Sequence, residues 1–175
     1  LPALLFSLPG TPIIYSGDEI GMGDNSARDD RHGVRTPMQW TAGPNGGFSP
    51  APPDRLFSPV IDDPVYSYQA VNVAAQESDG ASLLHWMRNM VALRKLFSVF
   101  GRGTIEFLEP ENRKVVAHVR RYQQDLILCV ANLSRLPQAV LLDLSAFDGV
   151  VPVEMLGYTP FPTIGTAPYQ LTLGA

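Results

Sequence analysis

The feature that most constrains the fold is a change of hydrophobic period at Gly101-Arg102-Gly103. Before this point, apolar residues recur at helical spacing and predict a helix over Ser82–Phe97. After it, short alternating or apolar segments separated by turn residues predict strands. The strands are expected at 104–108, 115–122, 126–132, 139–144, 150–156 and 169–173. The sequence therefore predicts an α/β portion followed by a small all-β antiparallel domain.

A second constraint lies at the start of the chain. Leu1–Leu8 resembles the last turns of a helix, and Pro9-Gly10 ends it. Thr11–Tyr15 is too short for a helix and rich in β-branched and aromatic residues, so it is expected to be a buried strand. Ligands gather at the carboxyl ends of parallel strands, so polar chemistry is expected from Ser16 onward.

The connection from Gly17 to Ser67 shows no sustained period and many Gly and Pro residues. A structureless connection of this length is uncommon unless it is functional or disordered. Its large apolar side chains argue against disorder. They are Met38, Trp40, Phe48, Leu56, Phe57, Tyr66 and Tyr68. A folded loop over a site is expected.

Composition excludes several classes of partner. The 13 Lys and Arg against 17 Asp and Glu give a net charge of -4, which argues against nucleic acid and anionic membranes. No segment reaches the roughly 18 apolar residues of a membrane span. The one cysteine, Cys129, lies in an apolar run and is expected to be a buried small hydrophobe. A reducing, cytoplasmic compartment follows as the default.

The candidate site begins with the acidic pair Asp18-Glu19. Two carboxylates in a cleft can serve as general acid and base. Neighbouring side chains at a strand end point to opposite faces, however, so one of these is expected to bind loop backbone or an arginine.

A mixed-charge loop follows the acidic pair. Its charged residues are Arg28, Asp29, Asp30, Arg31 and Arg35. The segment Pro37–Trp40, with Gln39 and Trp40, would carry part of this loop into the protein. A planar guanidinium can bind a carboxylate and a sugar hydroxyl together, which suits a polyol pocket. A solvated turn with surface ion pairs remains the alternative.

Metal and nucleophile motifs are weak. His32, His85 and His118 are too scattered to indicate zinc, and the acidic residues near Asp24 do not fit the EF-hand loop. No P-loop, dinucleotide fingerprint or Gly-x-Ser-x-Gly motif occurs. From the residues alone, the chain carries the rim of a carbohydrate-compatible site without catalytic machinery.

Several segments resemble the trehalose synthase (maltose α-D-glucosyltransferase) family of the α-amylase superfamily of glycoside hydrolases. They are GTPIIYSGDEIGMGDN, RHGVRTPMQW, VYSYQAVNVAAQ and GRGTIEFLEPENRKV. RTPMQW is shared with α-glucosidase relatives, whereas VNVAAQ and GRGTIEFLEPENRKV favour trehalose synthase. The resemblance runs over almost the whole chain.

The resemblance implies a fold in two parts. Residues 1–100 would be the end of a catalytic (β/α)₈ TIM barrel, with Thr11–Tyr15 as its eighth strand and Ser82–Phe97 as its eighth helix. Residues 101–175 would be the C-terminal antiparallel β-sandwich. The chain is interpreted as an excerpt of a longer protein, truncated at both ends.

The resemblance also implies an activity, which is interconversion of maltose and trehalose by a retaining double displacement. The three family carboxylates precede this chain, so no catalytic residue is assigned. Arg31 is the first choice for the arginine that holds glucose hydroxyls, and Arg35 is the second, as a loop brace. Asp18, Glu19, Gln39 and Trp40 are expected to support the site. Relatives commonly have Asp where this chain has His32, and an aromatic where it has Ser16.

Other properties stay open at this point. No cofactor is expected in these residues, and calcium is left open for the longer enzyme. Expected partners are the disaccharide substrate, a maltokinase and a second copy of the enzyme. The alternatives are an α-glucosidase or oligo-1,6-glucosidase that releases glucose to water, and a noncatalytic β-module for domain packing or maltokinase association.

Overall fold

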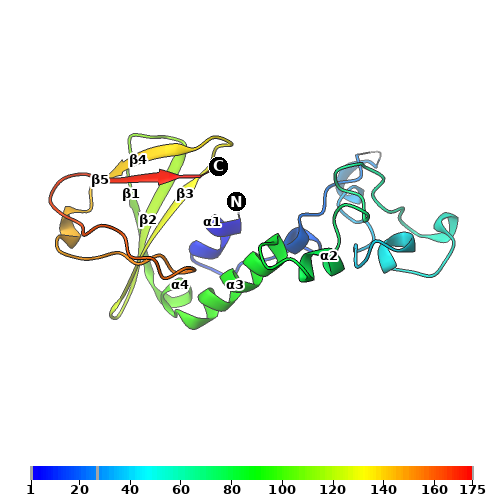
Figure 1. The fold of residues 1–175 in the computed structure, drawn as a ribbon, viewed down its shortest axis with the longest axis horizontal. Coiled ribbons are helices and arrows are strands. Elements are labelled where there is room, and N and C mark those ends of the chain that lie inside the picture. Colours follow the sequence, from blue (N-terminus) through cyan, green and yellow to red (C-terminus); the bar gives the residue numbers. More distant parts are fainter. Residues whose placement is uncertain (1, 27, 175) are drawn as a thin grey trace. The chain divides into compact units, whose positions relative to one another are not determined.

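The computed structural model describes residues 2–26 and 28–174, and of Asp30 it describes the backbone only. The chain forms two compact units (Figure 1). Unit 1 combines the residues up to Pro12 with those from Asn89 onward, and unit 2 is Ile13–Arg88. The helix α3, Leu83–Leu96, begins in unit 2 and ends in unit 1.

Unit 1 contains two antiparallel sheets. The first has the order β1-β2-β3, and the second pairs β4 with β5. The strands are β1 (Thr104–Leu108), β2 (Val115–Tyr122), β3 (Asp125–Asn132), β4 (Gln138–Leu142) and β5 (Tyr169–Leu173). A tight turn at Gln123, whose φ is 54°, joins β2 to β3. Figure 1 shows the second sheet as yellow and red arrows.

The two sheets share one apolar core. Its buried members come from β2, β4, β5 and the segments between them, and they are Val115, Ala117, Val140, Leu142, Leu144, Ile164 and Tyr169. Residues of one strand that are two apart lie on the same face, so Val115 and Ala117 present one face of β2 to this core. The expected antiparallel β-sandwich is confirmed.

The opposite face of β2 is also buried at His118 and Arg120. Short helices accompany it within unit 1. They are α1 (Pro2–Ser7) and α4 (Val99–Arg102), and α4 contacts β2. The expected entering helix and the helix over Ser82–Phe97 are both confirmed, the latter within one residue at each end.

Arg120 lies on this second face of β2 with none of its surface exposed. Its guanidinium donates hydrogen bonds to five backbone carbonyls, those of Ser7, Val99, Phe100, Gly103 and Thr104, at 2.6–3.1 Å. The last carbonyls of a helix have no partner inside the helix, so Ser7 in α1 and Phe100 in α4 supply ready acceptors, and the Val99 carbonyl also accepts from the Gly103 amide. Burial lowers the pKa of Arg120, but a guanidinium stays protonated in proteins.

Unit 2 is a folded loop region with short helices and no strand among its described residues. The helices are η1 (Asp18–Ile20), η2 (Asp30–His32), η3 (Pro44–Gly47), η4 (Pro53–Arg55) and α2 (Val73–Glu77). Ile20, Met38 and Leu84 form its buried core, with Met22, Val71 and Val73 packed against them. The expectation that the long connection is folded is confirmed.

Two expected strands are wrong. Thr11–Tyr15 is not a strand here, and Ile13 is 83% exposed. A strand needs a neighbour to satisfy its N–H and C=O groups, and no described residue pairs with this segment. Residues 150–156 form only an isolated bridge from Val153 to Pro160, because Pro152 removes a donor and the chain turns at 155–157. A short helix, η5 (Ser145–Phe147), precedes this segment.

Two further observations concern composition. Among the described residues, none of the helices has the length and apolar character needed to cross a membrane. Cys129 on β3 is half-buried, and burial raises the pKa of its thiol to about 11. The thiol is therefore protonated at neutral pH, as expected for a small apolar residue.

Candidate functional site

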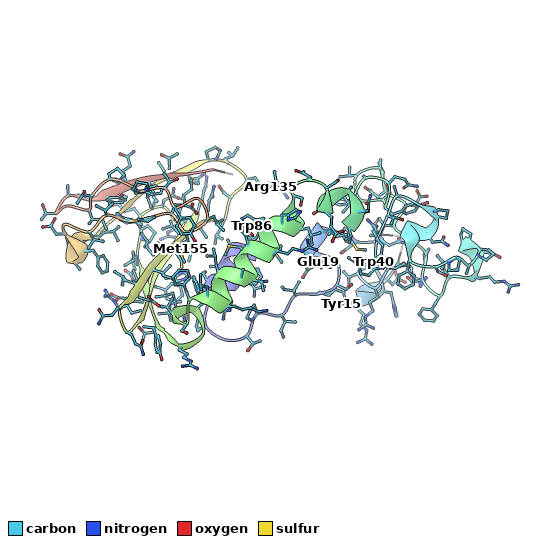
Figure 2. All side chains as sticks on the ribbon, turned by 60° about the horizontal axis from the view of Figure 1, so that its bottom comes forward. Tyr15, Glu19, Trp40, Trp86, Arg135 and Met155 are labelled. Carbon is cyan, nitrogen blue, oxygen red and sulfur yellow. The ribbon has the colours of Figure 1, made fainter. Side chains whose placement is uncertain are left out.

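The acidic pair forms the short helix η1, and both carboxylates bind backbone. The Tyr15 amide donates to the Asp18 carboxylate at 2.9 Å, and the Gly17 amide donates to the Glu19 carboxylate at 2.9 Å. Gly17 and Gly21 flank the helix at φ values of 99° and 70°, which glycine adopts without strain. The expectation that a carboxylate of this pair binds loop backbone is met by both. Figure 2 labels Tyr15 and Glu19 near this turn.

The acidic pair is joined to the buried core of unit 2. Ile20 follows the acidic pair directly, and Met38 belongs to the segment RTPMQW. Ser16 donates to the Met38 sulfur at 3.7 Å, which links the start of η1 to the same methionine. The loop between Ile20 and Met38 is therefore anchored in one apolar cluster at both ends.

The anchored loop carries the candidate arginines. Its backbone is held across its width, because the Asn25 amide donates to the Gly33 carbonyl at 3.0 Å. Arg31 sits in η2, and the Arg35 amide donates to the His32 carbonyl at 3.3 Å. Both arginine side chains are exposed. The Asp30 side chain of the expected mixed-charge cluster lies outside what the structure describes.

Gln39 and Trp40 connect the arginine loop to α2. Gln39 is 1% exposed, and its side-chain amide donates to the carbonyls of Tyr66 and Val71 at 3.1 and 2.5 Å. The amides of Val73 and Ala74, at the start of α2, donate to the carbonyls of Gln39 and Trp40, each at 2.9 Å. Trp40, which is labelled in Figure 2, is half-exposed, at 49% of its surface. These bonds hold the last two residues of RTPMQW against the segment from Tyr66 to Ala74.

Four of the candidate residues are thus held by hydrogen bonds to the backbone of unit 2, and their support of a site stays a prediction. Asp18, Glu19 and Gln39 are each bonded to backbone, and Trp40 is held by its main chain. The role of Arg31 and Arg35 toward a sugar stays a prediction. A cavity of about 850 Å³ lies in unit 1 and has an apolar lining. None of the six candidate residues lines it.

Two structural residues were missed by sequence reasoning. Gln76 bonds to η1 and to α3 in unit 2, and Arg120 bonds to helix ends in unit 1. Arg120 had a usable signal, because a charged residue within an apolar strand must find partners when it is buried. Gln76 had no such sequence signal beyond its place in VNVAAQ, because glutamine is common near helix ends.

The described residues do not fit a metal site. They contain no group of three or more His, Cys, Asp or Glu residues that could hold an ion. His118 is 1% exposed, and neither ring nitrogen has a hydrogen-bond partner among the described atoms. Burial, aided by the Arg120 charge, lowers the pKa of His118, while the Ser7 backbone opposes the shift.

Comparison with known proteins assigns both parts of the chain. Residues 1–103 match the alpha amylase catalytic domain, and residues 105–175 match the maltogenic amylase C-terminal domain. The chain belongs to the α-amylase family of glycoside hydrolases, with the end of the TIM-barrel domain followed by a C-terminal β-sandwich.

Similar curated proteins narrow the comparison further. The chain is 55% identical to a trehalose synthase of Pimelobacter sp. (strain R48), over 98% of this chain and 30% of that protein. It is 50% identical to a trehalose synthase of Thermus thermophilus, over 99% of this chain and 18% of that protein. The chain therefore spans less than a third of the length of these relatives.

Solved structures agree on the fold. An isomaltulose synthase of Erwinia rhapontici NX5 superposes with a TM-score of 0.77 at 24% identity, over 98% of this chain and 35% of that one. The trehalulose synthase of Pseudomonas mesoacidophila MX-45 superposes with a TM-score of 0.75 at 25% identity, over 98% of this chain and 36% of that one.

Proposed function

We propose that this chain is the carboxyl-terminal part of a trehalose synthase that interconverts maltose and trehalose by intramolecular transglucosylation. One observation carries the proposal. Trehalose synthases match at 50–55% identity over 98% or more of the chain, through both the barrel segment and the β-domain. The glucosidase relatives match less of it, at 25–33% identity over 77–78% of the chain.

The proposed reaction is a retaining double displacement, in which a carboxylate forms a glucosyl-enzyme and an acid later acts as base. Those carboxylates lie outside these residues in this proposal. The chain would contribute Arg31, whose guanidinium holds hydroxyls of the glucose, and Arg35, which braces the loop. The backbone bonds of Asp18, Glu19 and Gln39 support a loop held in one conformation.

The domain division belongs to the same proposal. Residues 1–100 would complete the barrel and residues 101–175 would form the sandwich, with the boundary between the two family matches as support. The chemistry needs no cofactor from these residues. Calcium in the longer enzyme, association with a maltokinase or a second copy, and a cytoplasmic location remain predictions.

The second candidate is a hydrolase of the same family. A probable oligo-1,6-glucosidase of Bacillus subtilis (strain 168) is 30% identical over 78% of this chain. The two activities differ in whether the freed glucose stays in a closed pocket or escapes to water.

One experiment distinguishes them. The intact enzyme that carries these residues is incubated with maltose, and trehalose and free glucose are measured over time. Trehalose as the main product supports the proposal, whereas glucose as the only product favours the hydrolase. The 175-residue chain alone should convert neither disaccharide, because the reacting carboxylates are absent from it, and turnover by the pure chain would contradict this assignment.

A further inference from the structure

Gln76 joins three segments of unit 2 through one side chain. Its Nε2 donates to the Ile20 carbonyl at 2.7 Å, and its Oε1 accepts from the Leu84 amide at 3.0 Å. The Gln76 carbonyl accepts from the Ser82 hydroxyl at 2.8 Å. Ile20 ends η1, Gln76 lies in α2 and Leu84 lies in the first turn of α3. A single amide thus fastens the acidic turn to the beginning of α3.

The fastened turn is the anchor of the arginine loop. Ile20 packs in the buried core with Met38 and Leu84. Arg31 and Arg35 lie in the loop between Ile20 and Met38. The core holds the side chain of Ile20, and Gln76 holds its carbonyl, so both the position and the rotation of this peptide are set.

The chemistry of the two bonds requires an amide of this length. The Ile20 carbonyl needs a donor and the Leu84 amide needs an acceptor, and glutamine supplies both on one planar group. An ionised glutamate keeps the acceptor and loses the donor, and leucine loses both. Asparagine is one methylene shorter. The Leu84 amide also belongs to the first turn of α3, whose N–H groups lack helical partners.

We propose that Gln76 is a positioning residue that holds η1 and the arginine loop in the conformation that retains glucose between the two halves of the reaction. The inference rests on the proposed function. When the donor to Ile20 is lost, the end of the loop gains freedom, water enters more readily and glucose escapes. Gln76 touches no reacting atom and acts through the loop.

The test uses the intact enzyme with Gln76→Glu, which removes the bond to Ile20 and keeps the acceptor for Leu84. The negative charge also lies near the start of α3, where it favours the helix. The ratio of free glucose to trehalose formed from maltose should rise about fivefold, the effect of one hydrogen bond. This ratio does not depend on the fraction of folded enzyme. Gln170→Leu, at an exposed glutamine on β5, is the matched control and should leave the ratio unchanged.

Hydrogen exchange gives an independent readout of the same contact. Four amides of the turn, at Asp18, Ile20, Gly21 and Met22, bond within residues 15–18. A peptide over Tyr15–Gly23 should exchange faster in Gln76→Glu and Gln76→Leu than in Gln170→Leu. Exchange and product ratio that both match the wild type would overturn the inference. A wild-type enzyme that makes no trehalose would contradict the proposed function but not the positioning role of Gln76. Hydrogen exchange of the Tyr15–Gly23 peptide would then decide whether Gln76 holds the turn.

Discussion

Arg94 and Arg120 bind the same turn of the chain from two different elements. Arg94, in α3, donates to the carbonyls of Phe6, Leu8 and Gly10, and Arg120, in β2, donates to the carbonyl of Ser7 between them. Phe6 and Ser7 are the last two residues of α1, whose carbonyls lack helical partners, and Leu8 and Gly10 lie in the turn that follows the helix. Backbone carbonyls therefore serve as acceptors for both guanidiniums, and no ion pair joins either arginine to a carboxylate among the described residues.

Arg120→Met should lower the free energy of unfolding by about 3–5 kcal/mol, since several buried carbonyls lose their donor at once. Methionine fits the space of the stem but offers no N–H group. Urea unfolding followed by near-UV circular dichroism measures the change.

The matched control is Arg121→Met on the same strand. The Arg121 side chain is 48% exposed and lies 4.0 Å from Glu106, so its loss should cost less than about 1 kcal/mol. Equal unfolding midpoints for the two variants would contradict the role of Arg120.

Gly103→Ala should destabilise the start of β1 by about 1–3 kcal/mol through overpacking. A Cβ at Gly103 would lie 2.7 Å from the Arg121 carbonyl oxygen and 2.9 Å from the Val99 Cγ2. Gly101→Ala is the control, because a Cβ there meets no atom within 4 Å and alanine favours the helix α4. Thermal unfolding should shift in opposite directions for the two variants.

The strands of unit 1 were predictable because each carries a local signal. β1 and β2 have the expected bounds, since alternating β-branched residues and the turns at Pro110–Arg113 and Gln123-Gln124 mark their ends. The failure at 150–156 has a physical reason: valines at 150, 151 and 153 signal a strand, but pairing requires a neighbour, and only Val153 has one.

The candidate site was less predictable, because it depends on contacts between distant residues. The hydrogen bonds from backbone amides to Asp18 and Glu19 follow from local turn chemistry, and the sequence predicted such a bond for one of the two carboxylates. The hydrogen bond from Gln76 to Ile20 joins residues 56 positions apart, and no periodic pattern in the sequence indicates it. The strand expected at Thr11–Tyr15 failed for the same reason, because a strand is defined by its partners and not by its own residues.

His118 should make stability depend on pH below about 6.5. Burial lowers its pKa in the folded state from the model-peptide value of 6.5, so the unfolded chain takes up the proton first as the pH falls. Stability is therefore full above that value and falls as the pH drops through 6.5 toward the lowered folded pKa, by at most about 1.4 kcal/mol per pH unit. His118→Phe should remove this component, as measured by urea unfolding from about pH 5 to about pH 8. Identical slopes for the variant and the wild type would refute it.

Cys129 should react slowly with iodoacetamide near neutral pH. Its thiol pKa of about 11 leaves roughly one molecule in a thousand ionised at about pH 8. The alkylation rate should rise about tenfold per pH unit until the pKa is reached, with free glutathione as the comparison. Mass spectrometry of the peptide over β3 measures the rate. Rapid modification at neutral pH would show that the thiol is not desolvated.

Arg31→Ala in the intact enzyme tests the proposed sugar contact. A guanidinium that binds glucose hydroxyls makes charge-assisted hydrogen bonds, and their loss should cost about 2–4 kcal/mol of transition-state binding, read from kcat/KM for maltose. Arg88→Ala is the control, because Arg88 is half-exposed and pairs with Glu77 at 3.0 Å on the outside of α3. The charge-conserving comparison is Arg31→Lys, which keeps the charge but loses the planar fork, so its kcat/KM should fall between those of wild type and Arg31→Ala. An unchanged kcat/KM in Arg31→Ala would remove this residue from the site, and a loss confined to Arg35→Ala would transfer the sugar contact to Arg35.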